Sequence, residues 1–369
     1  MTYTNVQHNS DSRQGAVLFL DTLAQLPPNK YGNDETLRKR ARSKHYTQSI
    51  VIPLLHLKSP LHKYYQSAFY CNTELQQSGV TLKGKYCNTR CCNVCNRIRT
   101  AKLMKGYLNQ MKGQQYFVTL TFPNVKQAYL KDSINQMIKN ATLIIRNLRE
   151  KKKIDVNGIR KLECTYNEKA NTYHPHFHLI VDTKEGANKI LEQWLKRYPT
   201  ASIKAQDIRK VNGDNDDSLK ELFKYSTKIG YKAKGEEENE EEGRGEIRIN
   251  IKALDKILIA MRGKRVFQPF GNIKKESEEV NGEELDAQSY NIPQAFSMNW
   301  IWLKHDWVNK YYQNLACVDA PKYKIVNTSE YEFRKPKQYR TPPDGPLFEY
   351  RKQQRELNKE SSKFEFQYT

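Results

Sequence analysis

The spacing of hydrophobic and polar positions changes several times along the middle of the chain, and each change predicts a new element. Residues 115–122 (QYFVTLTF) are rich in β-branched and aromatic side chains and stop at a Pro-Asn pair, which is typical of a strand followed by a turn. Apolar side chains then recur three and four positions apart over residues 130–148, behind a candidate N-cap at Asp132 or Ser133. We therefore expect a strand and then a long amphipathic helix.

Two more strands are expected at residues 161–166 and 176–181, on either side of a polar turn region at 167–173. In both strands apolar residues alternate with polar ones. Successive side chains of a strand point to opposite faces of the sheet. If the two strands pair as a hairpin, one face is apolar and the other carries Glu163 beside the histidines.

The elements that follow the predicted hairpin complete the order of helices and strands found in a common type of α+β fold. A helix is indicated over residues 187–198, a strand over 202–211 and a further helix over 218–232. The order β-α-β-β-α-β-α predicts an α+β fold of the ferredoxin-like or RRM-like type, an antiparallel sheet with helices on one face. We also expect a small zinc-binding module before this core and extra C-terminal elements after it.

Composition indicates a partner. The chain of 369 residues has 62 Lys and Arg against 41 Asp and Glu, a net charge of +21. Such an excess of positive charge favours a polyanionic partner, and nucleic acid is the commonest one. No apolar run is long enough to span a bilayer, and the start lacks the pattern of a signal peptide. We expect a cytoplasmic protein with no membrane partner.

Charge and polarity also suggest boundaries along the chain. We expect a flexible basic N-terminal arm at 1–45, a cysteine module with a basic DNA-binding segment at 46–113, the α+β core at 114–234, an acidic linker at 235–248, a basic amphipathic helix at 249–275 and a C-terminal extension at 276–369. The basic side chains expected to hold a DNA backbone are Arg97, Arg99, Lys102, Lys105, Arg262, Lys264 and Arg265.

Three of the eight histidines stand at alternate positions: His174, His176 and His178. Alternate residues of a strand point the same way, so His176 and His178 present two imidazoles side by side, as a metal ion requires. Glu163 from the neighbouring strand adds a carboxylate, and Glu168 in the turn is the alternative. Two nitrogens and one carboxylate suit Mn, Mg or Zn and leave coordination positions open for phosphate oxygens.

On the helix expected at 218–232, Glu221, Tyr225 and Lys228 are three and four residues apart and share one polar face. They have ordinary interpretations, since Ser218 and Glu221 can form a capping box and Lys228 can be a solvated lysine. Beside a histidine metal site the same stripe offers a nucleophile, a candidate base and a cation for phosphate chemistry.

Four of the seven cysteines fall within nine residues, with no spaced partner cluster elsewhere. Without a secretory signal, this crowding favours metal binding in a reducing compartment over disulfides. The four thiolates of a closed structural zinc site would come from Cys71, Cys87, Cys92 and Cys95. Cys91 is the alternative to Cys92, which we prefer because its two-residue spacing to Cys95 lets both thiolates face one metal.

Taken together, these motifs resemble those of the rolling-circle replication initiators of small bacterial plasmids, which belong to the HUH endonucleases. The matching segments follow the expected order between Cys71 and Gly271: CNTRCCNVCNRIRTAK, FVTLTFPN, LECTY, HPHFHLIV, ELFKYSTK and MRGKRVFQPFG. The pairing of HPHFH with a downstream Tyr-x-x-Lys is specific. The sequence departs from the family pattern at Cys91, where an apolar residue is usual.

The resemblance implies that His176 and His178 bind a divalent ion, Mg²⁺ or Mn²⁺, and that Tyr225 is the nucleophile. Glu221 is implicated in terminating the replication cycle, and Lys228 would offset phosphate charge or favour tyrosinate. The core would then be the nuclease of an endonuclease and strand transferase, which nicks the plasmid origin on a single-stranded segment and stays joined to the new 5′ end. A host helicase and DNA polymerase would act in trans.

Two other interpretations remain open from the sequence. A single-tyrosine HUH transposase or a mobilisation relaxase would use the same chemistry on other DNA, and the DNA flanking the gene would distinguish them. A zinc-containing nucleic-acid-binding regulator with an RRM-like sheet would bind without catalysis. The regulator predicts no covalent protein–DNA adduct and leaves the histidine cluster unexplained.

Overall fold

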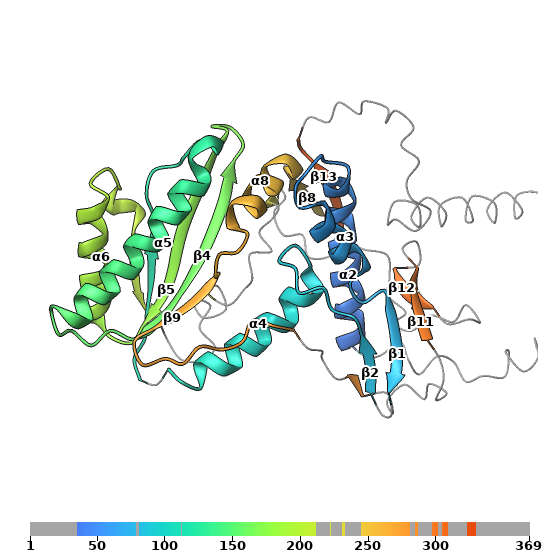
Figure 1. Cartoon of the computed structure of the whole chain (residues 1–369), viewed down its shortest axis with the longest axis horizontal. Helices are drawn as coiled ribbons and strands as arrows, with labels where there is room; N and C mark the ends of the chain where they lie inside the picture. Colours follow the sequence, from blue (N-terminus) through green and yellow to red (C-terminus); the bar gives the residue numbers. More distant parts are fainter. Residues whose placement is uncertain are drawn as a thin grey trace, which may run out of the picture.

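The computed structural model describes residues 35–78, 81–111, 113–211, 222, 231–232, 245–280, 285–286, 297–301, 305–308 and 323–329. In Figure 1 an α+β core lies at one end of the molecule and the cysteine module at the other, with helices α4 (Asn93–Leu108) and α8 (Ile251–Met261) between them. No helix in the described ranges combines the length and apolar character that crossing a membrane requires.

The core is built on an antiparallel sheet with strand order β6-β3-β5-β4-β9. Its strands are β3 (Tyr116–Leu120), β4 (Gly158–Asn167), β5 (Thr172–Val181), β6 (Asp207–Lys210) and β9 (Phe267–Phe270). Helix α5 (Gln127–Glu150) connects β3 to β4, and α6 (Lys184–Arg197) connects β5 to β6. This arrangement confirms the ferredoxin-like α+β fold, to which β9 adds an edge strand beside β4.

Alternation along the strands gives the sheet two different faces. On one face Leu162, Phe177 and Leu179 are buried against α5 and α6, which both lie on this side of the sheet in Figure 1. The opposite face carries Phe117 and Ile180, which pack against the following buried side chains of α4 and the neighbouring segments: Leu103, Tyr107, Val211, Leu222 and Val266. Helix α4 therefore covers part of the face that the other helices leave open.

The cysteine module combines two segments that are far apart in sequence, residues 35–84 and residues 285–308. Helices α2 (Glu35–Leu55) and α3 (His62–Tyr70) pack beside a second sheet, whose strands in spatial order are β10 (Leu285–Asp286), β2 (Thr81–Gly84), β1 (Glu74–Ser78), β11 (Ser297–Ile301) and β12 (Asp306–Val308). Trp300 and Trp307 pack edge to face, with ring centroids 4.9 Å apart. The indole of Trp307 donates to the Asn72 carbonyl at 2.9 Å, so C-terminal residues complete the module.

Helix α8 joins the core to the module. Its Ala253 and Ala260 pack into the core under α5, whereas Ile251 and Leu254 pack into the module. The buried Asp255 accepts a hydrogen bond of 2.7 Å from the Tyr65 hydroxyl of α3. A small sheet of β13 (Tyr323–Asn327), β8 (Gly245–Ile249) and β7 (Tyr231–Lys232) leads into α8.

Some elements differ from the sequence-based expectations. The prediction of a flexible arm is wrong for residues 35–45, which form the first turns of α2. Arg40 and Lys44 are buried there together with Ala41 on one face of the helix. Residues 1–34 lie outside the described ranges. The helix expected at 218–232 does not include its last two residues, since Tyr231–Lys232 pair with β8 as β7. Of the rest of this range, only Leu222 is described.

Two elements begin at other residues than predicted: helix α5 starts earlier, and strand β6 starts later. Helix α5 begins at Gln127 with no side-chain cap, not at Asp132 or Ser133, because a bridge between Val125 and Tyr173 directs the chain into the helix earlier. The strand expected at 202–211 is preceded by a 3₁₀ turn, Ile203–Ala205, so β6 is limited to four residues.

Candidate metal centres and DNA-contacting residues

Glu163, His176 and His178 converge on the sheet face that α5 and α6 do not cover. Glu163 lies directly opposite His176 in the β4–β5 hairpin, and His178 is two residues further along the same face. The Glu163 Oε2 is 3.3 Å from His176 Nε2 and 3.4 Å from His178 Nε2. All three side chains are about nine-tenths buried, so water competes little for this arrangement.

Hydrogen bonds orient both imidazoles. His176 Nδ1 is 3.0 Å from the His174 carbonyl oxygen, which can only accept, so Nδ1 carries the proton. His178 Nδ1 is 3.2 Å from the Thr119 hydroxyl, which can accept in the same way. Both Nε2 atoms therefore face Glu163, the arrangement from which two histidines can bind one metal ion.

Glu163 is ionised by its surroundings. Burial alone would raise its pKa, but hydrogen bonds with His176 and His178 and the charge of Lys161 outweigh this effect and hold the pKa well below its usual range. Lys161 lies on the same face as Glu163, fully buried, and forms an ion pair with the carboxylate oxygen Oε1. The oxygen Oε2 remains directed at the two histidines.

These three side chains fit a divalent ion. Two ligands at about 2.1 Å from one ion lie about 3.0–3.4 Å apart at octahedral or tetrahedral angles. The separations of 3.3 and 3.4 Å meet this condition. A carboxylate oxygen and two ring nitrogens in such proximity need protons on the nitrogens or a metal ion between them. The group could hold a metal, and Glu168, the alternative carboxylate, instead accepts a hydrogen bond from Asn250.

A second candidate metal centre brings together Cys71, Cys87, Cys92 and Cys95, whose sulfur atoms all lie within 4.8 Å of one another. The Cys95 sulfur is 3.5 Å from that of Cys71 and 3.7 Å from that of Cys87. Cys91 is also buried, but its sulfur contacts the Thr89 hydroxyl at 3.6 Å and is not part of the cluster. Four converging thiols fit a closed tetrahedral site.

The thiols perturb one another because they are crowded. Hydrogen bonds from Cys71, Cys92 and Cys95 hold the pKa of Cys87 far below its usual range, whereas burial raises the pKa of Cys92 well above it. A cation at the centre would allow all four to be thiolates together. The buried Lys44 supports the cluster from outside, donating to the Cys71 carbonyl at 2.6 Å.

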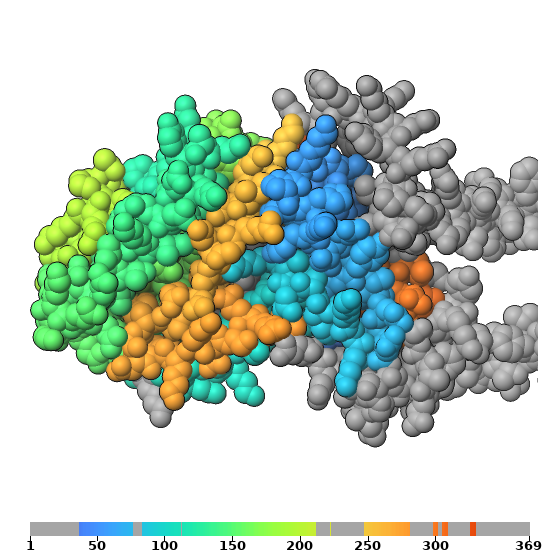
Figure 2. Space-filling view, viewed as in Figure 1, coloured from blue at the N-terminus to red at the C-terminus, as the bar shows by residue number. Residues whose placement is uncertain are grey.

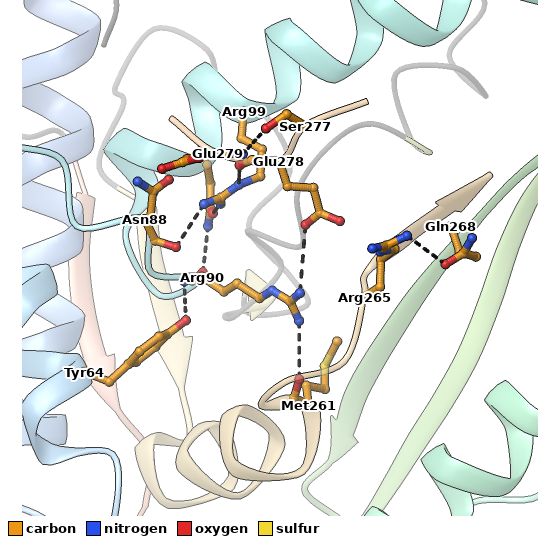
Figure 3. A network of polar contacts seen from close by, with 11 residues as sticks. Tyr64, Asn88, Arg90, Arg99, Met261, Arg265, Gln268, Ser277, Glu278 and Glu279 are labelled. Atoms are coloured by element: carbon orange, nitrogen blue, oxygen red, sulfur yellow. Dashed lines mark hydrogen bonds and ion pairs between the residues drawn. The ribbon is translucent and has the colours of Figure 1, made fainter. Parts of the chain in front are cut away.

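The residues expected to contact DNA fall into two groups. Lys102 and Lys105 are exposed on α4, and Arg97 is partly buried. Arg99 corrects our expectation, because it is 3% exposed and its guanidinium donates to the Asn88 and Glu278 carbonyls (Figure 3). Arg99 therefore holds α4 against residues 276–280 and is not available to a DNA backbone.

Arg262, Lys264 and Arg265 follow α8. Arg262 is exposed, and the other two line an open groove of about 520 Å³ between β9 and the cysteine module. The further charged residues of this groove are Arg90, Lys275, Glu276 and Glu278. Figure 3 shows Arg90 spanning the groove wall between the Met261 carbonyl, at 3.3 Å, and the Glu278 carboxylate, at 3.9 Å.

The predicted nucleophile stripe, Glu221, Tyr225 and Lys228, lies outside the described residues. Leu222 is described, is fully buried, and belongs to the same buried cluster as Phe117 and Ile180, which lie on the sheet face of the histidines.

Sequence reasoning missed two residues of the histidine site. Thr119 and Lys161 each follow the period-2 alternation that places them on the face of His178 and Glu163. That alternation was a usable signal for both, but pairing of Thr119 with His178 depends on the β3–β5 register.

Fold and site together define a basic α+β protein that carries, on a ferredoxin-like sheet, a group of two histidines and one carboxylate that could hold a metal ion. The chain belongs to the replication protein family, whose family model matches residues 79–312, more than half of the chain. This match confirms the resemblance to replication initiators.

Individual relatives share shorter regions. A Protein rep of Staphylococcus aureus is 30% identical over 166 residues, which cover 40% of this chain and 71% of the relative. A Protein rep of a Bacillus species is 32% identical over 148 residues, covering 35% of this chain and 46% of the relative. A Protein rep of Lactiplantibacillus plantarum is 23% identical over 229 residues, which cover 54% of this chain and 68% of the relative. No solved structure gives a significant match.

Proposed function

We propose that the protein initiates rolling-circle replication of a plasmid by nicking one DNA strand at the origin and joining its 5′ end to Tyr225. The observation that carries this proposal is the convergence of Glu163, His176 and His178 on the open face of the sheet, in a chain of the replication protein family. Mg²⁺ or Mn²⁺ suits the mixed nitrogen and oxygen ligands. Zn²⁺ suits the four thiols.

A divalent ion bound to these three side chains would polarise the scissile phosphate as a Lewis acid. Tyr225 oxygen would then form a bond to phosphorus while the bond from phosphorus to O3′ breaks, and the leaving O3′ would take up a proton. The ester that forms can be attacked by a 3′-OH in the reverse direction, which gives strand joining. Lys228 would offset the phosphate charge, and Glu221 would activate the attack that ends the cycle.

The position of Leu222 supports this assignment. It packs on the histidine side of the sheet, and three residues of chain span at most about 11 Å. Tyr225 is therefore within chain reach of that face. Exposed Lys102, Lys105 and Arg262 and the groove residues Lys264 and Arg265 would hold the DNA backbone. A host helicase would open the duplex, and a host polymerase would extend the free 3′-OH.

The test is covalent capture of DNA. Full-length protein is mixed with Mg²⁺ or Mn²⁺ and a labelled single-stranded oligonucleotide carrying the origin of its own plasmid, and is then resolved on a denaturing gel. Wild type should form a labelled adduct, and Tyr225→Phe should form none while binding the oligonucleotide normally. Tyr129→Phe, a change at a tyrosine that is 66% exposed on α5, is the matched control and should behave as wild type. An adduct in the Tyr225→Phe variant would exclude Tyr225 as the nucleophile.

A further inference from the structure

Arg160 is a buried cation on the helix-covered face of the sheet. It alternates along β4 with Lys161 and therefore points away from the histidine site. The residue is 5% exposed, and its guanidinium lies over the Phe177 ring, 4.6 Å from the ring centroid. Across the described ranges, no hydrogen bond or ion pair reaches this guanidinium, and its Nε is buried without an acceptor.

Such a residue is costly unless something pairs with it. Burying a charge without a partner is among the larger penalties a fold can carry, and a cation–π contact offsets only part of it. Burial lowers the pKa of Arg160 to about 10, which leaves the side chain charged at neutral pH. The fold therefore maintains a positive charge at this place.

A cavity of about 680 Å³ adjoins Arg160, between α5 and the edge strand β9. Its volume is in the range of small-molecule sites and is much larger than an inorganic anion needs. Leu120, Ile144 and Leu179 form part of an apolar wall. In Figure 2, seen from the helix side, the orange residues around β9 border the green surface of α5, the two elements between which the cavity lies.

The charges around the cavity favour an anion with more than one negative charge. Arg146, Arg149 and Lys153 line it together with Arg160, against the single carboxylate of Glu150. A monocarboxylate would neutralise little of this excess, whereas a phosphate ester carries close to two charges at neutral pH. A guanidinium also matches phosphate geometry with paired hydrogen bonds.

We propose that this cavity is a binding site for a small organic phosphate, whose phosphate group pairs with Arg160 and whose apolar body packs against the Leu120, Ile144 and Leu179 wall. The site is separate from the proposed nicking centre, because Arg160 and Glu163 point to opposite faces of the sheet. It can therefore be tested by binding alone, whatever the outcome for DNA cleavage.

Isothermal titration calorimetry on the full-length protein provides the test, with phenyl phosphate as the probe. Phenyl phosphate should bind at least about tenfold more tightly than inorganic phosphate, which lacks the apolar body, or benzyl alcohol, which lacks the charge. Arg160→Met should weaken phenyl phosphate binding about tenfold or more. Binding of all three probes at equal strength, or not at all, would overturn the proposal.

A second variant covers the case in which Arg160→Met does not fold. Arg146→Glu reverses a charge at an exposed residue of the cavity and should weaken phenyl phosphate binding several-fold. Lys139→Glu makes the same change at an exposed position of α5 outside the cavity and should leave binding unchanged. A single-stranded oligonucleotide forms the last arm: if Arg160→Met weakens its binding equally, the cavity contacts DNA phosphates and the small-molecule proposal is wrong.

Discussion

At the scale of single residues, the geometry of the histidine site depends on the groups that form hydrogen bonds or ion pairs with His176, His178 and Glu163. The backbone carbonyl of His174 and the hydroxyl of Thr119 each bind one Nδ1, which leaves both Nε2 atoms for the metal. Lys161 holds the other oxygen of Glu163. Outer partners of this kind commonly change metal affinity by about 10–100-fold when removed. Of the two groups that bind an imidazole Nδ1, only the Thr119 hydroxyl belongs to a side chain, so it can be removed by substitution without altering a ligand.

Thr119→Val keeps the shape and strand preference of the side chain but removes the hydroxyl that fixes His178. We expect the Mn²⁺ affinity of the histidine site to fall about tenfold, in protein that keeps the metal of its cysteine centre. Thr119→Ser restores the hydroxyl and should bind within about twofold of wild type. The measurement is Mn²⁺ titration followed by electron paramagnetic resonance. Equal loss in the Val and Ser variants would point to a packing effect and not to the hydrogen bond.

The part of the site that lies within one hairpin could be predicted from the alternation of residues along its strands. His176, His178 and Glu163 could be placed on one face because period-2 alternation within a hairpin needs no knowledge of the rest of the fold. The burial of Arg99 was not predictable in the same way. Its partners, the Asn88 and Glu278 carbonyls, are set by contacts between segments 11 and 179 residues away in the chain.

At the scale of elements, the cysteine centre explains how α4 begins. Cys92 is the N-cap of α4, and Cys95 is in its first turn, so the two-residue spacing places both sulfurs beside the helix N-terminus. The positive end of the helix favours thiolates there. Cys91 precedes the helix, and its sulfur contacts the Thr89 hydroxyl at 3.6 Å instead of joining the four-thiol group. The adjacent cysteines therefore have different surroundings.

A matched pair of substitutions separates these two cysteines. Cys92→Ala should lose the tightly bound metal and lower the melting temperature by roughly 5–10 °C, because a structural metal contributes directly to folding. Cys91→Ala removes only a small buried group and should retain the metal. Metal content by atomic emission and thermal unfolding by circular dichroism check both. If Cys91→Ala loses the metal and Cys92→Ala keeps it, the assignment must be exchanged.

Element prediction succeeded where periodicity was long and uninterrupted, as in α5 and the β4–β5 hairpin. It failed at residues 35–45, because a run of basic residues suggested solvent exposure. Lys44 in fact donates to the Phe69 and Cys71 carbonyls, so its charge is accommodated inside the module. Strands β10 and β11 could not have been assigned to the module from sequence, since they pair with β2 and β1, which lie about 200 residues earlier in the chain. Strand β12 joins the same sheet by pairing with β11.

At the scale of the whole molecule, charge is distributed unevenly between surface and interior. The net charge is +21, but Arg40, Lys44, Arg99, Arg160 and Lys161 are all buried and cannot contact a DNA backbone. Helix α8 spans the junction between core and module, and Lys264 and Arg265 follow it directly into the groove beside the module. Lys264 and Arg265 are therefore placed to bind a DNA strand that contacts both the core and the cysteine module. The net charge alone would not single them out.

This placement predicts which charges set the salt dependence of DNA binding. Each phosphate contact to single-stranded DNA contributes about −0.7 to the slope of log affinity against log salt. Replacing both Lys264 and Arg265 by Ala should therefore reduce the magnitude of the slope by about 1.4, measured by fluorescence anisotropy with a labelled oligonucleotide. The control replaces Lys189 and Lys196, which form ion pairs with Glu192 on α6, and should leave the slope unchanged. Equal effects of the two double variants would show that net charge alone, and not the groove, governs DNA binding.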